Sequence, residues 1–167
     1  RAIKIFERLD EVLGGDTEHP LYEVVSLELR ILRAKTGKVV GPPPDRKIDD
    51  TEAQLLRVEA IALFEYSTTP AHKESARRAR ITSASEAVDR LIRLIDSGYI
   101  DNELIRIIVQ YYPKIVGRNI DPLTTLVRAE QAFEYGHDAT AAGQYEKFFA
   151  TVKNRKDINL DQFHFRY

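Results

Sequence analysis

The chain has 167 residues, of which 43% are hydrophobic and 31% charged, a composition that is typical of a globular domain rather than a disordered chain. Its 25 Lys and Arg balance 26 Asp and Glu, so no large net charge draws it to nucleic acid or to an anionic membrane. No apolar run reaches the roughly 20 residues that span a bilayer, and no signal peptide opens the chain, so we expect a soluble, cytoplasmic protein.

Three residue types are missing altogether. The absence of Cys excludes disulfides, thiolate metal ligands and a cysteine nucleophile. Met and Trp are also absent, and the chain begins with Arg1. We therefore expect a fragment from which methionines or loop residues are missing, and we give spacings within helices more weight than spacings across loops.

Hydrophobic residues at helical spacing predict two helices near the start of the chain, over 2–13 and 21–34. Gly14 and Gly37 follow them, and glycine accepts the left-handed backbone that ends many helices. In the second helix, the face predicted to enter the core consists of Leu21, Val24, Val25, Leu29 and Leu32.

The segment 37–50 is predicted to be a loop, because Gly41 is followed by three prolines that cannot continue a helix. It is the candidate position for a linker, a subdomain boundary or an excised stretch. A third helix is predicted over 52–66, with Asp50 or Thr51 as its N-cap. Its sequence leaves almost no polar face, which is typical of a central, buried helix.

A basic segment, 72–81, follows. A new helix is then predicted to begin at Ser83, because Ser83 and Glu86 have the spacing of a capping box. Gly98 ends this helix, and Asp101 is predicted to cap a fifth helix whose apolar face extends to Ile115.

The last two predicted helices lie on either side of Gly136. Asp121 and Pro122 form an N-cap with proline at the first helical position. The core residues expected in this helix are Leu123, Leu126, Val127 and Phe133, and those in the seventh include Ala141, Tyr145, Phe148 and Val152. Short turns at Gly98 and Gly136 predict antiparallel helix pairs. We therefore expect an all-α fold, a bundle of about seven helices with antiparallel hairpins in a single domain over 1–167.

The predicted hairpin over 129–152 resembles part of a tetratricopeptide repeat. Gly136, Ala141 and Tyr145 stand where that family has its turn glycine, small alanine and aromatic residue. Phe148 departs from the pattern, because the family has a small residue there. An ordinary helical hairpin is the alternative interpretation.

A longer set of motifs runs in order along 48–113. It begins with Ile48, an apolar helix over 55–64 and a Ser/Thr turn ending in proline over 67–70. A Ser-x-x-Glu-Ala helix follows over 83–88, then an acidic turn after glycine over 98–104, and last the pair Tyr112 and Pro113. This order resembles the C-terminal half of the HD-GYP domain, a helical phosphodiesterase family that cleaves cyclic di-GMP.

The chain departs from that family where the resemblance would imply metal ligands. Ala60 stands at the position of an aspartate, and the Gly-Tyr-Pro signature is absent. The four histidines include one His-Asp pair, His137 with Asp138, and it lies beyond the resembling stretch. The resemblance therefore implies a degenerate or truncated signalling domain, related to cyclic di-GMP phosphodiesterases but without catalytic metals.

Few groups suggest chemistry. The histidines are scattered, and no pair has the helical spacing that aligns metal ligands. Asp49 and Asp50 precede a helix, so capping explains them better than Mg²⁺ binding. We predict no catalytic residue, metal ligand or cofactor. The basic cluster Lys73, Arg77, Arg78 and Arg80 is a candidate anion-binding site for phosphates or an acidic partner, with a solvated basic face as the alternative.

The final third of the chain is rich in aromatic residues. Neighbouring aromatic residues on a helix cannot all face the core, and tyrosine is favoured at interfaces. The candidate partner-binding residues are Tyr111, Tyr135, Phe149, Phe163 and Phe165. We therefore expect a non-catalytic binding or regulatory module for a protein partner. A homo-oligomer and a cyclic dinucleotide ligand remain open, whereas nucleic acid and a membrane span are not expected.

Overall fold

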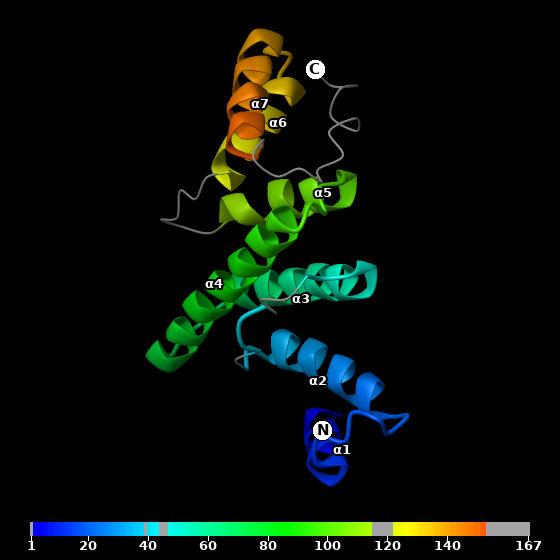
Figure 1. Ribbon diagram of the computed structural model, residues 1–167. Coiled ribbons are helices and arrows are strands. Elements are labelled where there is room, and N and C mark those ends of the chain that lie inside the picture. Colours follow the sequence, from blue (N-terminus) through cyan, green and yellow to red (C-terminus); the bar gives the residue numbers. More distant parts are fainter. Residues whose placement is uncertain (1, 39, 44–46, 115–121, 153–167) are drawn as a thin grey trace. The chain divides into compact units, whose positions relative to one another are not determined.

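The structure, a computed structural model, describes residues 2–38, 40–43, 47–114 and 122–152. These residues form seven α-helices and one 3-10 helix, with no strand among them, so the predicted all-α fold is confirmed (Figure 1). The helices are α1 (Ala2–Leu13), α2 (Tyr22–Thr36), α3 (Asp50–Thr68), α4 (Glu74–Asp96), α5 (Asn102–Tyr111), η1 (Tyr112–Lys114), α6 (Leu123–Glu134) and α7 (Asp138–Val152). Within the same ranges, no helix is both long enough and apolar enough to cross a membrane.

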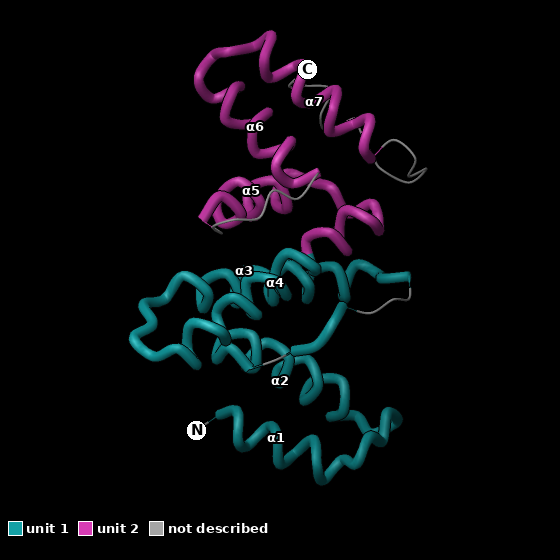
Figure 2. Tube along the Cα trace, turned by 90° about the vertical axis from the view of Figure 1, so that its left-hand side faces the viewer, with its two compact units in different colours: residues 1–90 teal, residues 91–167 magenta. Residues whose placement is uncertain are grey.

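The chain divides into two compact units, residues 1–90 and 91–167, and the division falls within α4 (Figure 2). The loop 37–50, predicted as a candidate boundary, lies inside the first unit. There the carbonyl of Gly41 accepts a hydrogen bond from Arg90 of α4, 3.0 Å away. That the two units act as a single domain stays a prediction.

Helix α1 packs against α2, but none of its residues is fully buried. Ile5, Leu9 and Val12 are exposed, and their spacing places them on one stripe. The prediction that Leu21 and Val24 enter the core is wrong, because each is 55% exposed. The core positions of α2 are Val25, Leu29 and Ala34. The periodic pattern identified the apolar face of α2, but neighbouring helices bury only part of that face.

The sequence of α3 predicted a helix with almost no polar face, but the structure shows a charged residue at its centre. Glu59 is fully buried in its middle, and its carboxylate joins two neighbouring helices. Arg30 of α2 donates from Nε to Oε1 at 2.7 Å, and Arg90 of α4 donates from Nε to Oε2 at 2.6 Å. Hydrophobic periodicity missed this residue because Arg57 and Glu59 interrupt the long apolar run without changing its overall pattern.

The two arginines extend this ionic network. Arg30 also forms a bidentate pair with Glu52, at 2.7 and 3.1 Å. Burial lowers the pKa of Arg30, but its hydrogen bonds to Glu52 and Glu59 outweigh burial and raise the pKa above its ordinary value. The guanidinium of Arg90 is also buried, and it donates to the carbonyls of Glu86 and Gly41 at 2.9 and 3.0 Å. The network thus links α2, α3, α4 and the loop at Gly41.

Helix α4 begins at Glu74, nine residues before the predicted start at Ser83. The capping-box interpretation is therefore wrong. The Ser83 hydroxyl donates to the carbonyl of Ala79 at 3.0 Å, as in a helix interior, and the Glu86 carboxylate accepts from the backbone N–H of Val40 at 3.3 Å. The basic segment before Ser83 is rich in alanine and arginine, which are strong helix formers and extend the helix backwards.

The caps of α3 and α5 are aspartates. Asp49, rather than Asp50 or Thr51, caps α3 by accepting from the backbone N–H of Glu52 at 2.8 Å. Asp101 caps α5, as predicted, by accepting from Leu104 at 2.9 Å. At the end of α2, Gly37 has φ +66°, and a Cβ there would collide with the Tyr66 ring, so glycine is required on both counts.

In the second unit, α6 and α7 form the hairpin predicted at Gly136. Gly136 has φ +70°, and the backbone N–H of His137 donates to the carbonyl of Ala132 at 2.8 Å, which closes the end of α6. The buried residues of the hairpin include Leu123, Leu126, Ala141, Tyr145, Phe148 and Val152. Phe133, predicted to lie in the core, is 42% exposed. Helix α5 ends at Tyr111, and Ile115, Asp121, Phe163 and Phe165 lie outside the described residues.

We predict that Glu59→Gln lowers the free energy of unfolding by about 3 kcal/mol, because the buried guanidinium of Arg90 loses its counter-charge. Urea denaturation followed by circular dichroism measures this loss. The matched control is Asp89→Asn, an exposed acid-to-amide change on α4, where we expect a change below about 0.5 kcal/mol. Equal effects of the two variants would show that the network does not hold the first unit together.

Candidate functional site

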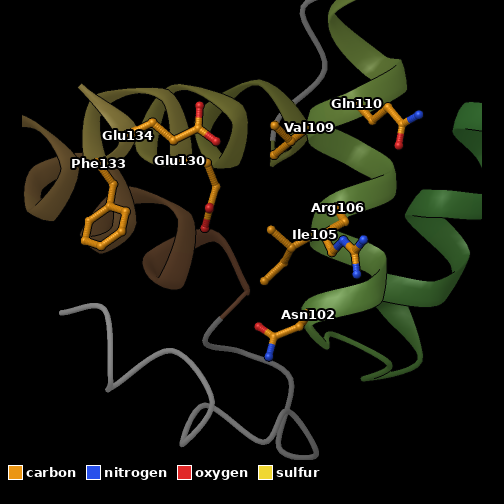
Figure 3. Close-up of a pocket in the computed structure, with 8 residues that line it drawn as sticks. All are labelled: Asn102, Ile105, Arg106, Val109, Gln110, Glu130, Phe133 and Glu134. Carbon is orange, nitrogen blue, oxygen red and sulfur yellow. The ribbon is translucent and has the colours of Figure 1, made fainter. Parts of the chain in front are cut away.

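A groove of about 410 Å³ lies between α5 and α6 in the second unit (Figure 3). Five residues of α5 line one wall, and their spacing places them on one face of that helix: Asn102, Ile105, Arg106, Val109 and Gln110. Three residues of α6 line the other wall: Glu130, Phe133 and Glu134. The groove is therefore built from two regular helices rather than from loops.

The groove has an apolar floor. Ile105 is buried and Val109 half-buried, and both point from α5 toward α6 in Figure 3. Phe133 adds an aromatic ring to the opposite wall, with 42% of its surface exposed. A large aromatic side chain left open beside an apolar floor is typical of a surface that receives another apolar group.

A buried carboxylate lies in the same wall as this ring. Glu130 is almost fully buried, and its Oε1 accepts a hydrogen bond from the Tyr145 hydroxyl of α7 at 2.6 Å. This short hydrogen bond orients the carboxylate within the wall of the groove. Glu134 adds a second, exposed carboxylate, and Arg106 faces the groove from α5. Among the described lining residues, Glu134 is therefore the exposed carboxylate that is placed to meet a cationic ligand.

Three of the predicted partner-binding residues lie in the described part of the chain, but none lines the groove. Tyr135 is 77% exposed and directly follows the end of α6, next to Glu134. Tyr111 is half-buried, with the Lys114 ammonium 5.2 Å from its ring centroid. Phe149 is half-buried and stacks on Tyr145, with ring centroids 6.4 Å apart, so it packs behind the residue that holds Glu130.

Sequence reasoning missed Phe133 as a site residue because its spacing matches the core positions of α6. It follows Leu126 by seven residues and Glu130 by three, so it lies on their face of the helix. That face is buried at Leu126 and open at Phe133. A helical pattern does not show where a neighbouring helix stops covering it.

The predicted anion-binding residues cluster around the start of α4. Arg77 and Arg78 both lie within ion-pair distance of Glu74, at 4.0 and 3.4 Å, and Arg80 donates to the carbonyl of Pro70. Lys73 is exposed just before the helix. The cluster therefore exists as a basic surface whose arginines have partners within the chain, and its binding of anions stays a prediction.

The described residues of the 48–113 stretch, which resembles HD-GYP domains, form α3, α4, α5 and the beginning of η1. Across the ranges that the structure describes, no three His, Asp or Glu residues are grouped closely enough to hold a metal ion. No protein family model, curated protein or solved structure matches the chain. The lining of the α5–α6 groove is therefore the basis for a functional proposal.

We predict that Tyr145→Phe destabilises the second unit by about 2 kcal/mol, because the buried Glu130 carboxylate loses a charge-assisted hydrogen bond. Hydrogen exchange of the α6 and α7 amides, together with urea denaturation, would measure the loss. Tyr135→Phe removes the same hydroxyl from an exposed ring and should leave the unfolding free energy unchanged. The interpretation of Glu130 as a held carboxylate is wrong if both variants behave like the unmodified chain.

Proposed function

We propose that the protein is a non-catalytic binding module that docks a protein partner at the C-terminal hairpin α6–α7 and the neighbouring α5. The observation that carries the proposal is the α5–α6 groove, in which the exposed ring of Phe133 stands beside the buried, tyrosine-held carboxylate of Glu130. Interface energy commonly concentrates in such aromatic anchors. The exposed ring of Tyr135, close by in the chain, would extend the contact.

The chemistry of the groove defines the partner. A volume of about 410 Å³ suits a few side chains of a docked segment rather than a whole helix. The apolar floor at Ile105 and Val109 would receive a large aliphatic or aromatic side chain. The exposed carboxylate of Glu134 would pair with a lysine or arginine of the same segment. We therefore expect an amphipathic peptide segment with a basic residue about one helical turn from its apolar anchor.

The groove does not favour an anionic ligand. Its lining carries one more acidic than basic group, which opposes the phosphates of a cyclic dinucleotide. The arginines of the basic surface at the start of α4 already pair with Glu74 and Pro70. A degenerate HD-GYP-like signalling domain remains a separate proposal, which calorimetry with cyclic di-GMP would test directly.

Selection of peptides against the folded protein tests the binding proposal. We expect the enriched peptides to share a large apolar residue and a nearby Lys or Arg. Phe133→Ala should weaken their binding by about tenfold or more, because truncation removes the anchor. The unfolding free energy should change little, since the ring is 42% exposed.

Charge variants provide the matched control for this experiment. Glu134→Gln and Gln131→Lys each raise the net charge by one and lie on the same helix, but only Glu134 lines the groove. We expect Glu134→Gln alone to weaken the binding of the basic peptides. Enriched peptides without a basic residue, or equal binding by all variants, would refute the proposed site.

A further inference from the structure

The first unit carries an exposed apolar stripe on α1. Ile5, Leu9 and Val12 form it at helical spacing, and Val12 is 76% exposed. Lys4 and Arg8 are exposed and border the stripe along one edge. We call these five residues the α1 stripe.

Three exposed charged residues lie along this edge of the stripe, Lys4, Arg8 and Glu11, so the edge has a net positive charge of one. The nearby Glu7 is engaged with Lys38, whose ammonium lies 2.6 Å from its carboxylate. That hydrogen bond holds the pKa of Glu7 below its ordinary value, so the carboxylate stays ionised and paired. With Glu7 paired, Lys4 and Arg8 outnumber Glu11 and leave the border with a net positive charge.

The same unit contains a second groove, of about 540 Å³, between α2 and α3. Its floor is apolar and consists of Leu27, Ile31, Leu55 and Val58, and its rim carries Glu28 and Asp50, both exposed. We call it the α2–α3 groove. The exposed Val24 lies three residues before Leu27 on the same face, so the apolar surface continues along α2 beyond the groove.

We propose that the α1 stripe of one copy of this chain docks into the α2–α3 groove of a second copy. The two surfaces are complementary in both respects that matter for docking. The stripe offers apolar side chains with a basic border, and the groove offers an apolar floor with an acidic rim. Arg8 and Lys4 of one copy would face Glu28 and Asp50 of the other.

A second copy is the occupant that the structure favours because one chain presents both halves of the contact. Helix α1 packs against α2 (Figure 1). The stripe residues Ile5, Leu9 and Val12 remain exposed, so they do not fill the groove of their own chain. Each copy would thus present an exposed stripe and an open groove. Such a contact either closes as a reciprocal pair or continues from copy to copy.

The expected association is weak. A single helical stripe in a shallow groove buries less surface than the roughly 1,600 Å² of a standard interface, so we expect a dissociation constant in the micromolar range. The contact would therefore appear only as a concentration-dependent equilibrium. It lies in a different unit from the α5–α6 groove, so its failure leaves the proposed partner-binding function standing.

Sedimentation velocity of the full chain, over about a hundredfold range of concentration, tests the proposal. We expect the unmodified chain to associate as its concentration rises. Val12→Asp should weaken association by about a hundredfold, because it places a charge within the apolar contact at the most exposed residue of the stripe. Since Val12 is 76% exposed, the monomer should keep its fold, which circular dichroism checks.

Charge reversal identifies the groove as the receiving surface. Arg8→Glu and Glu28→Arg should each weaken association by about tenfold, and the double variant should restore it, because the pair is re-formed with opposite sign. Glu23→Arg is the control: it makes the same reversal on α2, outside the groove, and should have no effect.

Three results would overturn the proposal. The first is an unmodified chain that stays monomeric over the whole range. The second is an assembly that Val12→Asp leaves intact. The third is a double variant no stronger than the single variants, because the stripe would then dock on a surface other than the α2–α3 groove.

Discussion

The first unit depends on one buried carboxylate. Glu59 lies in the middle of α3, and Arg30 and Arg90 approach it from α2 and α4. A buried charge is costly unless it is fully paired, so these three helices can pack only in the register that brings both guanidinium groups to it. Arg90 then extends the constraint to the carbonyl of Gly41, which ties down part of the loop between α2 and α3.

The second unit also contains a buried glutamate on a helix, but its hydrogen-bond donor differs. Glu130 is also a nearly buried helical glutamate, but the donor from its neighbouring helix is the neutral hydroxyl of Tyr145. Two guanidinium groups compensate the charge of Glu59, whereas a phenol hydroxyl orients the carboxylate of Glu130. The first carboxylate therefore holds α2, α3 and α4 together. The second lines a groove beside Phe133, where a cationic group can reach its surroundings.

Local signals in the sequence predicted the elements of the fold well. Glycine ends and aspartate caps located most helix boundaries, and Asp101 and Gly136 act as expected. Long-range pairing was out of reach, because nothing in the sequence around Glu59 indicates which distant arginine meets it. The capping-box pattern at Ser83 failed for a related reason. Spacing shows that a cap can form there, but not whether the preceding residues already continue the helix.

The exposed apolar residues show that helical periodicity does not predict which apolar side chains are buried. Val24 and Phe133 both follow core-like spacing, and both are open at the surface. A repeating pattern shows that one face of a helix is apolar, but it does not show whether another helix packs on that face. Where no element of the chain packs on an apolar face, a second molecule can bury that face, and charged residues beside it can select the molecule. The positions at which sequence reasoning about the core failed are thus the positions at which binding is best supported, Phe133 in the α5–α6 groove and Val24 beside the α2–α3 groove.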